Sequence, residues 1–203
     1  IIPFTRGPVR SRKLENIKEE VGRIVKNGYK EVVLTGIHVA SYGKDSGDMS
    51  LIDVIESIAE IEGLERIRTS SVEPLIITEE FVQRLGAVDK FCPHFHLSLQ
   101  SGSDSVLSRM NRRYTSQEYR EAVNTIRRTF PYAAITTDVI VGFPEETDQE
   151  FEQTYEFLKE LKLYETHIFK YSPRNGTKAA EMPDQVDPSV KNSRSECLIK
   201  LNE

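Results

Sequence analysis

The chain has 203 residues, of which 29% are charged and 38% hydrophobic, and its net charge is −5. This length suffices for one well-buried domain, or for one domain with a tail. The negative net charge argues against electrostatic binding of nucleic acid over the whole surface. No apolar run reaches the roughly 20 residues of a membrane span. The cysteines, Cys92 and Cys197, predict no disulfide framework. We therefore expect a cytoplasmic protein without membrane association.

Helical and strand patterns alternate along the chain. Ser11 is expected to cap a first helix, which ends near Gly28. Runs rich in β-branched residues predict strands at residues 31–35, 66–70, 94–99, 134–141 and 165–170. Helices are predicted at residues 51–61, 78–85, 104–110, 116–129 and 147–161, the last with a capping box of Thr147 and Glu150. A loop up to Pro188 and a polar helix follow.

The alternation of strands and helices predicts the fold class. Consecutive β/α units indicate parallel strands with right-handed crossovers and helices on the outer face of the sheet. A closed eight-stranded barrel needs roughly 250 residues. We therefore expect an α/β fold, namely a partial (β/α) barrel with an open, mostly parallel sheet of about five strands. The first residues read as a loop before a helix, which predicts a truncated chain lacking its first strand.

Polar groups follow the ends of the predicted strands, where parallel α/β folds bind ligands. The candidates are Thr35, Gly36, Glu73, Gln100, Ser101, Asp138, Gly142 and Tyr171. Two carboxylates, an amide and nearby arginines suit a ligand with ribose hydroxyls, an amino group and a carboxylate. Phe143 is suited to cover a purine ring, and Gly142 lets the backbone approach a ligand.

Each candidate also has a structural alternative. Glu73 can cap the helix that follows it, Asp138 can pair with an arginine of a neighbouring strand, and residues 100–103 can form a simple turn. The four histidines lack metal-ligand spacing and are expected to be structural, so no metal site is predicted. The basic residues Arg6, Arg10, Arg12 and Lys13 form either a solvated helix entry or a local nucleic-acid patch.

Several motifs resemble one known family, the radical S-adenosylmethionine methylthiotransferases. They are LTGIHVASYG (residues 34–43), RIRTSSVEP (66–74), HLSLQSGSDSVLSRMNRRYT (96–115), TDVIVGFPEET (137–147) and FKYSPRNGTKAA (169–180). TGIHVASYG and SSVEP resemble the threonylcarbamoyladenosine branch, because the isopentenyladenosine branch typically has other residues there. The first residues resemble the segment after the family's CxxxCxxC loop. MPDQVDPSVKNSRSECLIKL (182–201) resembles the helix that leads into its RNA-binding TRAM domain.

The resemblance implies an activity and its cofactors. The full-length enzyme would add a methylthio group to C2 of N6-threonylcarbamoyladenosine in tRNA, at position 37. It would use S-adenosylmethionine and 4Fe–4S clusters, one of them held by three cysteines, to form a 5′-deoxyadenosyl radical. The implied domains are a partial radical core over residues 1–183 and a linker helix over residues 184–203, with a TRAM domain beyond.

The resemblance also implies roles for the strand-end residues. Glu73 would bind the methionine amino group or the ribose, and Gln100 and Asp138 the ribose hydroxyls. Arg112 would hold the carboxylate, with Arg113 as the second choice. The backbone of Thr35 and Gly36 would lie beside the methionine. Phe143 and the backbone of Val141 and Gly142 would line the adenine, while Ser101 and Tyr171 complete the set of cofactor-binding residues.

This chain departs from the family pattern in two respects. It contains no CxxxCxxC motif, and Cys92 and Cys197 match no cluster-ligand position, so we expect the chain alone to be inactive and assign no catalytic residue. Glu145 stands where the family usually has glycine, which predicts a distorted turn.

Two other functions remain open. One is a non-radical β/α-barrel enzyme, for which Lys170 would need a partner base. The other is a non-catalytic nucleic-acid-binding module. The predicted strand at residues 31–35 would also expose an edge, which predicts a homodimer.

Overall fold

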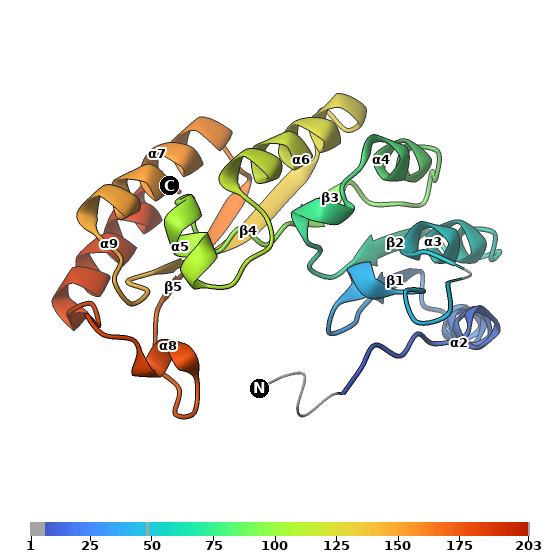
Figure 1. Ribbon diagram of the computed structural model, residues 1–203. Coiled ribbons are helices and arrows are strands. Elements are labelled where there is room, and N and C mark those ends of the chain that lie inside the picture. The colour runs from blue at the N-terminus through green and yellow to red at the C-terminus, as the bar shows by residue number, and fades with distance from the viewer. Residues whose placement is uncertain (1–6, 48, 203) are drawn as a thin grey trace. The chain divides into compact units, whose positions relative to one another are not determined.

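The computed structural model describes residues 7–47 and 49–202 and divides the chain into two compact units. The first unit comprises the chain up to residue 96 together with residues 125–133. The second comprises residues 97–124 and the chain from residue 134 onward (Figure 1). Residues 1–6, which include Arg6 and begin the segment that resembles the one after the family's CxxxCxxC loop, lie outside the described residues.

The first unit packs three helices and two short 3₁₀ turns around parallel strands. Its elements are α2 (Leu14–Lys26), β1 (Glu31–Leu34), η1 (Val39–Ser41), α3 (Leu51–Ala59), β2 (Arg66–Thr69), η2 (Pro74–Ile76), α4 (Glu79–Gly86) and β3 (His94–His96). Strands β1 and β2 are parallel, with Val32 beside Ile67. Both side chains are buried, as are Ile55 and Ile58 of α3. The apolar stripe of α3 thus supplies a large part of this core.

One predicted helix cap in this unit is wrong. The N-cap of α2 is Lys13, which makes no side-chain cap hydrogen bond. Ser11 instead bonds the loop after β1: its backbone N–H donates to Asp45 Oδ2 at 2.8 Å, and its Oγ accepts from the Gly43 N–H at 2.8 Å. A serine hydroxyl can bond either its own helix or a distant loop. The tertiary contact takes precedence here.

The second unit is built on a parallel pair of longer strands. Its elements are α5 (Asp104–Arg109), most of α6 (Ser116–Thr129), β4 (Ala134–Val141), α7 (Asp148–Leu161), β5 (Glu165–Lys170), α8 (Lys178–Glu181) and α9 (Pro188–Leu201). Strands β4 and β5 run parallel, with Asp138 beside His167. Residues 97–100 follow the other edge of β4, where Leu97 N–H donates to Thr136 O and Gln100 N–H to Asp138 O, both at 2.8 Å.

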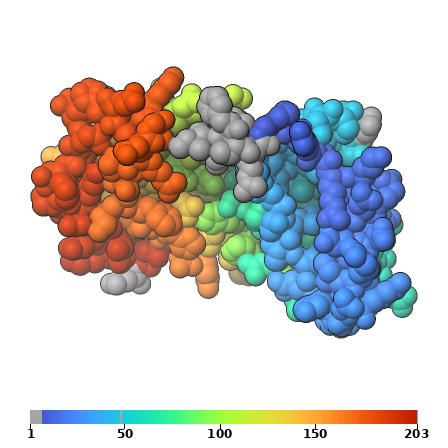
Figure 2. Space-filling view, turned by 90° about the horizontal axis from the view of Figure 1, so that it is seen from below, coloured from blue at the N-terminus to red at the C-terminus, as the bar shows by residue number. Residues whose placement is uncertain are grey.

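Helix α9 belongs to the packed body of the second unit. It contacts β5, β4 and α7 (Figure 1), and Leu198 on its inner side is buried. Figure 2 shows that the chain after β5, coloured orange to red, forms much of the surface of this unit on the face in view. The prediction of a core over residues 1–183, a linker helix and a TRAM domain beyond it stays a prediction.

The predicted α/β class with parallel strands is confirmed. All five strand regions contain a strand, although the third is limited to His94–His96. The capping box of Thr147 and Glu150 is also present at α7. Helix α8 lies in a region predicted to be loop, and the division into two units was not predicted. None of the described helices is long and apolar enough to cross a membrane.

Candidate ligand-binding strand ends

The carboxyl ends of β1 and β2 lie side by side in the first unit. Ser70 N–H donates to Leu34 O at 2.9 Å, which aligns the two ends. Thr35 and Gly36 follow β1 and are exposed. Glu73 follows β2 in extended conformation, as expected for a residue before proline. Of the predicted site residues, Thr35, Gly36 and Glu73 therefore share one edge of the first unit.

Glu73 has a partner that the sequence did not reveal. Its Oε2 lies 2.9 Å from Nε2 of His38, and Nδ1 of the same ring lies 2.5 Å from Oγ of Ser41. Glu73 makes no side-chain cap bond to η2, so the capping alternative is wrong. A histidine held at both ring nitrogens fixes the carboxylate that it contacts. The motif IHVAS, which carries His38 and Ser41, was the available signal.

In the second unit, Gln100 stands at the end of the segment beside β4. Its φ of 73° is left-handed, which is uncommon for a residue other than glycine. Its N–H donates to Asp138 O at 2.8 Å and its carbonyl accepts from Ile140 N–H at 2.9 Å. The side chain is only 7% exposed. A left-handed residue occurs both in turns and at binding sites, so the ligand contact and the simple-turn alternative both stay predictions.

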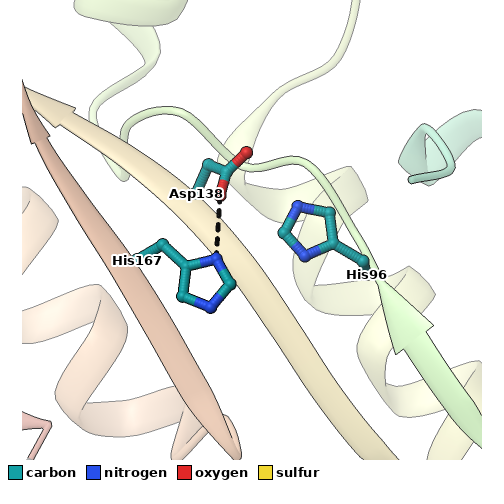
Figure 3. Close-up of side chains that lie close together, drawn as sticks. All are labelled: His96, Asp138 and His167. Atoms are coloured by element: carbon teal, nitrogen blue, oxygen red, sulfur yellow. Dashed lines mark hydrogen bonds and ion pairs between the residues drawn. The ribbon is translucent and has the colours of Figure 1, made fainter. Parts of the chain in front are cut away.

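Asp138 on β4 is paired with His167 on β5. Its Oδ1 lies 3.2 Å from His167 Nδ1, and the two side chains point toward one another (Figure 3). The third residue drawn there, His96, ends β3 in the first unit. Glu165 Oε1 is 3.6 Å from the other nitrogen of His167. Asp138 thus has a cross-strand histidine as one of its partners.

Ser101 and the adjacent glycine are enclosed by α7. The Ser101 hydroxyl lies 3.2 Å from Thr154 Oγ1, and Gly102 N–H donates to the same oxygen at 3.1 Å. A Cβ on Gly102 would come within 2.8 Å of Thr154 Cα, so only glycine fits this approach. Ser101 is fully buried, and its assignment as a ligand contact stays a prediction that would have to use its backbone.

Val141, Gly142, Phe143 and Tyr171 meet at the ends of β4 and β5. Tyr171 N–H donates to Val141 O at 2.9 Å. The rings of Phe143 and Tyr171 pack edge to face with centroids 5.2 Å apart. The Tyr171 hydroxyl is buried and has no hydrogen-bond partner among the described residues. A buried donor without a partner is costly, and a ligand with an acceptor here would satisfy it.

Gly142 is left-handed, with φ of 70°, but the space beside it is filled. A Cβ there would lie 2.3 Å from Cγ of Lys191 on α9. The ammonium of Lys191 donates to Tyr171 O at 3.1 Å and lies 5.2 Å from the Tyr171 ring centroid. The missing side chain of Gly142 therefore admits another side chain of the protein. Its backbone contact with a ligand stays a prediction.

A buried ion pair supports the same turn from behind. Glu146 Oε2 accepts from Gly142 N–H at 2.7 Å and from Arg194 Nη1 at 2.6 Å. Glu146 is 5% exposed and Arg194 6%. Burial raises the pKa of the Glu146 carboxyl, while the Gly142 N–H and the Arg194 guanidinium oppose this rise. Neither Glu146 nor Arg194 was among the predicted site residues. Arg194 was not considered because α9 was expected to be a linker helix.

The remaining predicted residues lie on the loop after α5. Arg112 is half-exposed and its backbone N–H donates to Leu107 O at 2.9 Å, whereas Arg113 is exposed. Neither guanidinium forms an ion pair within the described part of the chain, which leaves both available for a ligand carboxylate. Of the basic cluster near the start, Arg12 pairs with Glu20.

The cysteines of this chain do not fit an iron–sulfur cluster. Such a cluster is held by several thiolates at close range. The chain has two cysteines, Cys92 and Cys197, one in each unit. Tyr171, whose hydroxyl is unpaired, and Gln100 lie at strand ends, where parallel α/β folds bind ligands, and the binding of S-adenosylmethionine there stays a prediction. Glu145, where the family usually has glycine, has a left-handed φ of 65°, so this turn retains a glycine-like backbone.

Comparisons with known proteins point to one superfamily. The chain is 46% identical over 204 residues to "Threonylcarbamoyladenosine tRNA methylthiotransferase MtaB" of Bacillus subtilis (strain 168), covering 100% of this chain and 45% of that protein. It is 44% identical over 202 residues to "tRNA-2-methylthio-N(6)-dimethylallyladenosine synthase" of Thermoanaerobacter sp. (strain X514), covering 99% of this chain and 43% of that protein. The chain thus spans less than half the length of these relatives.

A solved structure agrees with the fold. Coproporphyrinogen III oxidase (HemN) from Escherichia coli, described as a radical SAM enzyme, matches with a TM-score of 0.63 at 15% identity, over 92% of this chain and 44% of that one. The family model described as "Radical SAM superfamily" matches residues 2–158. Because this match covers well over half of the chain, the chain belongs to the radical SAM superfamily.

Proposed function

We propose that the chain is the core part of a radical S-adenosylmethionine methylthiotransferase that modifies C2 of N6-threonylcarbamoyladenosine in tRNA. The observation that carries this proposal is the 46% identity to the Bacillus subtilis protein of that printed name, which extends over the whole chain. The relative named for dimethylallyladenosine is almost as similar, at 44% identity, so sequence identity alone does not decide which nucleoside is modified. The motifs TGIHVASYG and SSVEP favour the threonylcarbamoyl substrate.

Each unit carries at its strand ends groups that suit one part of S-adenosylmethionine. When bound, this cofactor supplies the radical-forming adenosyl group and the methyl group of such a reaction. Glu73, held by His38 at 2.9 Å, would accept hydrogen bonds from the methionine ammonium. Gln100 and Asp138 would orient the ribose hydroxyls, and Arg112 would hold the carboxylate. The Val141–Phe143 segment and Tyr171 would line the adenine and exclude water from it.

The chain alone would bind the cofactor without turning over. Its two cysteines cannot hold a cluster, so activity belongs to a longer protein that brings the remaining ligands. The partner is then tRNA, and the compartment is the cytoplasm. Self-association through the β1 edge is a separate prediction, which sedimentation at high protein concentration would test: a clean monomer would refute it.

Two alternatives lose support. A non-radical β/α enzyme would use Lys170 as a nucleophile. Its Nζ instead donates to Asn192 Oδ1 at 2.9 Å, and no carboxylate forms an ion pair with it within residues 7–47 and 49–202. A nucleic-acid-binding module would need a basic surface, whereas Arg12 of the candidate patch is already paired with Glu20 and the net charge is −5. Neither explains the match to the radical superfamily.

The decisive experiment is nucleoside analysis of tRNA from a strain that lacks its own methylthiotransferases. The full-length protein that contains this chain should restore the methylthio form of threonylcarbamoyladenosine and leave dimethylallyladenosine unmodified. Glu73→Gln should reduce the product, while Glu152→Gln on the exposed face of α7 should not. Methylthiolation of dimethylallyladenosine alone would refute the substrate, and no methylthiolated nucleoside would refute the activity.

A further inference from the structure

We propose that Lys191 and Arg194 of α9 are positioning residues for the nucleoside end of the ligand site. They act through Glu146 and Tyr171 to hold the turn after β4, defined here as residues 141–146. The part of this inference that concerns the ligand rests on the proposed function. The part that concerns the turn rests on contacts within the second unit alone.

Two buried cations on one helix face need a reason, because lysine and arginine are almost never fully buried unless they are paired. Lys191 is 9% exposed and Arg194 6%. Other polar and charged residues of the same helix, such as Asn192, Glu196 and Lys200, are exposed. Lys191 and Arg194 are three positions apart, which places them on the same side of the helix. That side faces the turn after β4.

Arg194 reaches the turn through a shared carboxylate. Its Nη1 donates to Glu146 Oε2 at 2.6 Å and to Glu146 O at 3.0 Å, and its Nη2 donates to Asp148 Oδ1 at 2.7 Å. The guanidinium also lies 5.4 Å from the Phe151 ring centroid. The same Glu146 Oε2 accepts the Gly142 N–H at 2.7 Å. Arg194 therefore fixes the direction in which the amide of Gly142 points.

Lys191 acts on the other side of the turn. Its aliphatic chain lies against Gly142, where a Cβ would be 3.1 Å from Cδ and from Cε. Its Nζ donates to the carbonyl oxygen of Tyr171. The backbone N–H of Tyr171 in turn donates to the carbonyl oxygen of Val141. The Tyr171 ring packs against Phe143 at 5.2 Å. One lysine thus contacts the residues that follow both strands, and one of these, Tyr171, carries the unpaired hydroxyl.

A role in packing alone would predict a different response to mutation. Loss of a purely stabilising ion pair lowers the stability of the whole unit and raises hydrogen exchange in all its elements. Loss of a positioning contact releases the turn first, and ligand affinity falls while distant elements stay protected. Exchange measured peptide by peptide separates these two cases.

The test compares Arg194→Met with Lys200→Met, which removes an exposed cation from the same helix. In Arg194→Met, exchange over residues 141–146 should rise at least about tenfold, because a buried carboxylate loses its partner. Exchange in α6 should not change, and Lys200→Met should match the wild type throughout. Arg194→Lys should restore part of the protection. Lys191→Met, which keeps the apolar contact with Gly142, should raise exchange at Tyr171.

The second readout is calorimetric titration of the same proteins with S-adenosylhomocysteine. Affinity should fall about threefold to tenfold in Arg194→Met and Lys191→Met and stay unchanged in Lys200→Met. Absence of binding by the wild type would overturn the proposal that this chain alone binds the cofactor, and it would leave the tRNA experiment above as the test of the proposed function. Unchanged exchange over the turn in Arg194→Met would overturn the positioning role, whatever the binding result. If exchange over the turn rises in Arg194→Met while the affinity for S-adenosylhomocysteine stays at the wild-type value, the link between the turn and the ligand is overturned. Should Arg194→Met fail to fold, Glu146→Gln with Arg194→Met removes both buried charges and takes its place.

Discussion

Gly142→Ala is expected to destabilise the protein for two separable reasons. The residue has φ of 70°, and its Cβ would lie 2.3 Å from Lys191 Cγ. The left-handed backbone costs an alanine about 1–2 kcal/mol, of which roughly 0.4–1 kcal/mol returns through the lower entropy of the unfolded chain. Overpacking against a buried side chain adds about 1–3 kcal/mol.

Gly176→Ala is the matched control. Gly176 has a nearly equal φ of 77°, but nothing lies within 4 Å of the position of its Cβ. Its substitution should therefore cost only the backbone part, roughly 1 kcal/mol or less. The difference between the two variants isolates the clash with Lys191. Because the chain contains no tryptophan, urea unfolding is best followed by far-UV circular dichroism, at equal m-values.

A double-mutant cycle with Lys191→Ala completes the experiment. If Lys191 causes the clash, Gly142→Ala should cost at least about 1 kcal/mol less in the Lys191→Ala background than in the wild type. Equal costs in both backgrounds would refute the reasoning. So would a Gly142→Ala variant no less stable than Gly176→Ala.

Three further outcomes are expected. Glu145→Gly should raise the free energy of unfolding by roughly 0.5–1 kcal/mol, because φ at this position is 65° and glycine adopts it without strain. The same change at the helical Glu152 should instead lower the free energy of unfolding. If Glu145→Gly also lowered it, the backbone at Glu145 would not be strained. The pKa of Glu150 is lowered from 4.5 to about 2 by hydrogen bonds from Arg109, Ser105 and Thr147, so its contribution to stability is complete above pH 4.5 and is lost as the pH falls toward 2. Glu150→Gln should flatten the acid limb of the stability profile, and an unchanged limb would exclude this carboxylate as its source. Tyr171→Phe should leave the unfolding free energy within about 0.5 kcal/mol of the wild type while weakening S-adenosylhomocysteine binding about threefold to tenfold, and undiminished binding in calorimetry would show that the hydroxyl meets no ligand.

The regular elements could be predicted because their signals are local. The β-branched run of residues 134–141 and the capping box of Thr147 and Glu150 depend on neighbouring residues, and both are present in the structure. The prediction that Ser11 caps the first helix was wrong because its hydroxyl bonds a loop more than 30 positions away. Nothing in the flanking sequence distinguishes that contact from a helix cap. Helix α8, of four residues, is too short to show a helical period.

The sequence predicted which residues follow the strands better than it predicted which residues contact one another there. The position of Glu73 after a strand follows from the parallel β/α pattern, but its pairing with His38 depends on how two separate loops fold. The roles of Lys191 and Arg194 were missed because α9 has an almost even mixture of polar residues around its axis, which hides the buried side. For Asp138 the alternative to a ligand contact was an arginine partner, and only the register of β4 and β5 reveals that His167 lies beside it.

The pairing of Glu146 with Arg194 limits how the protein can be dissected for study. Shortened versions that stop at residue 183 would lose Arg194, whose guanidinium lies 2.6 Å from Glu146, together with the helix that packs on β5, β4 and α7. In such a version the Glu146 carboxylate would have no guanidinium partner, and the apolar surface that α9 covers would meet water. Removal of the residues after 183 would therefore take away part of the packing of the second unit.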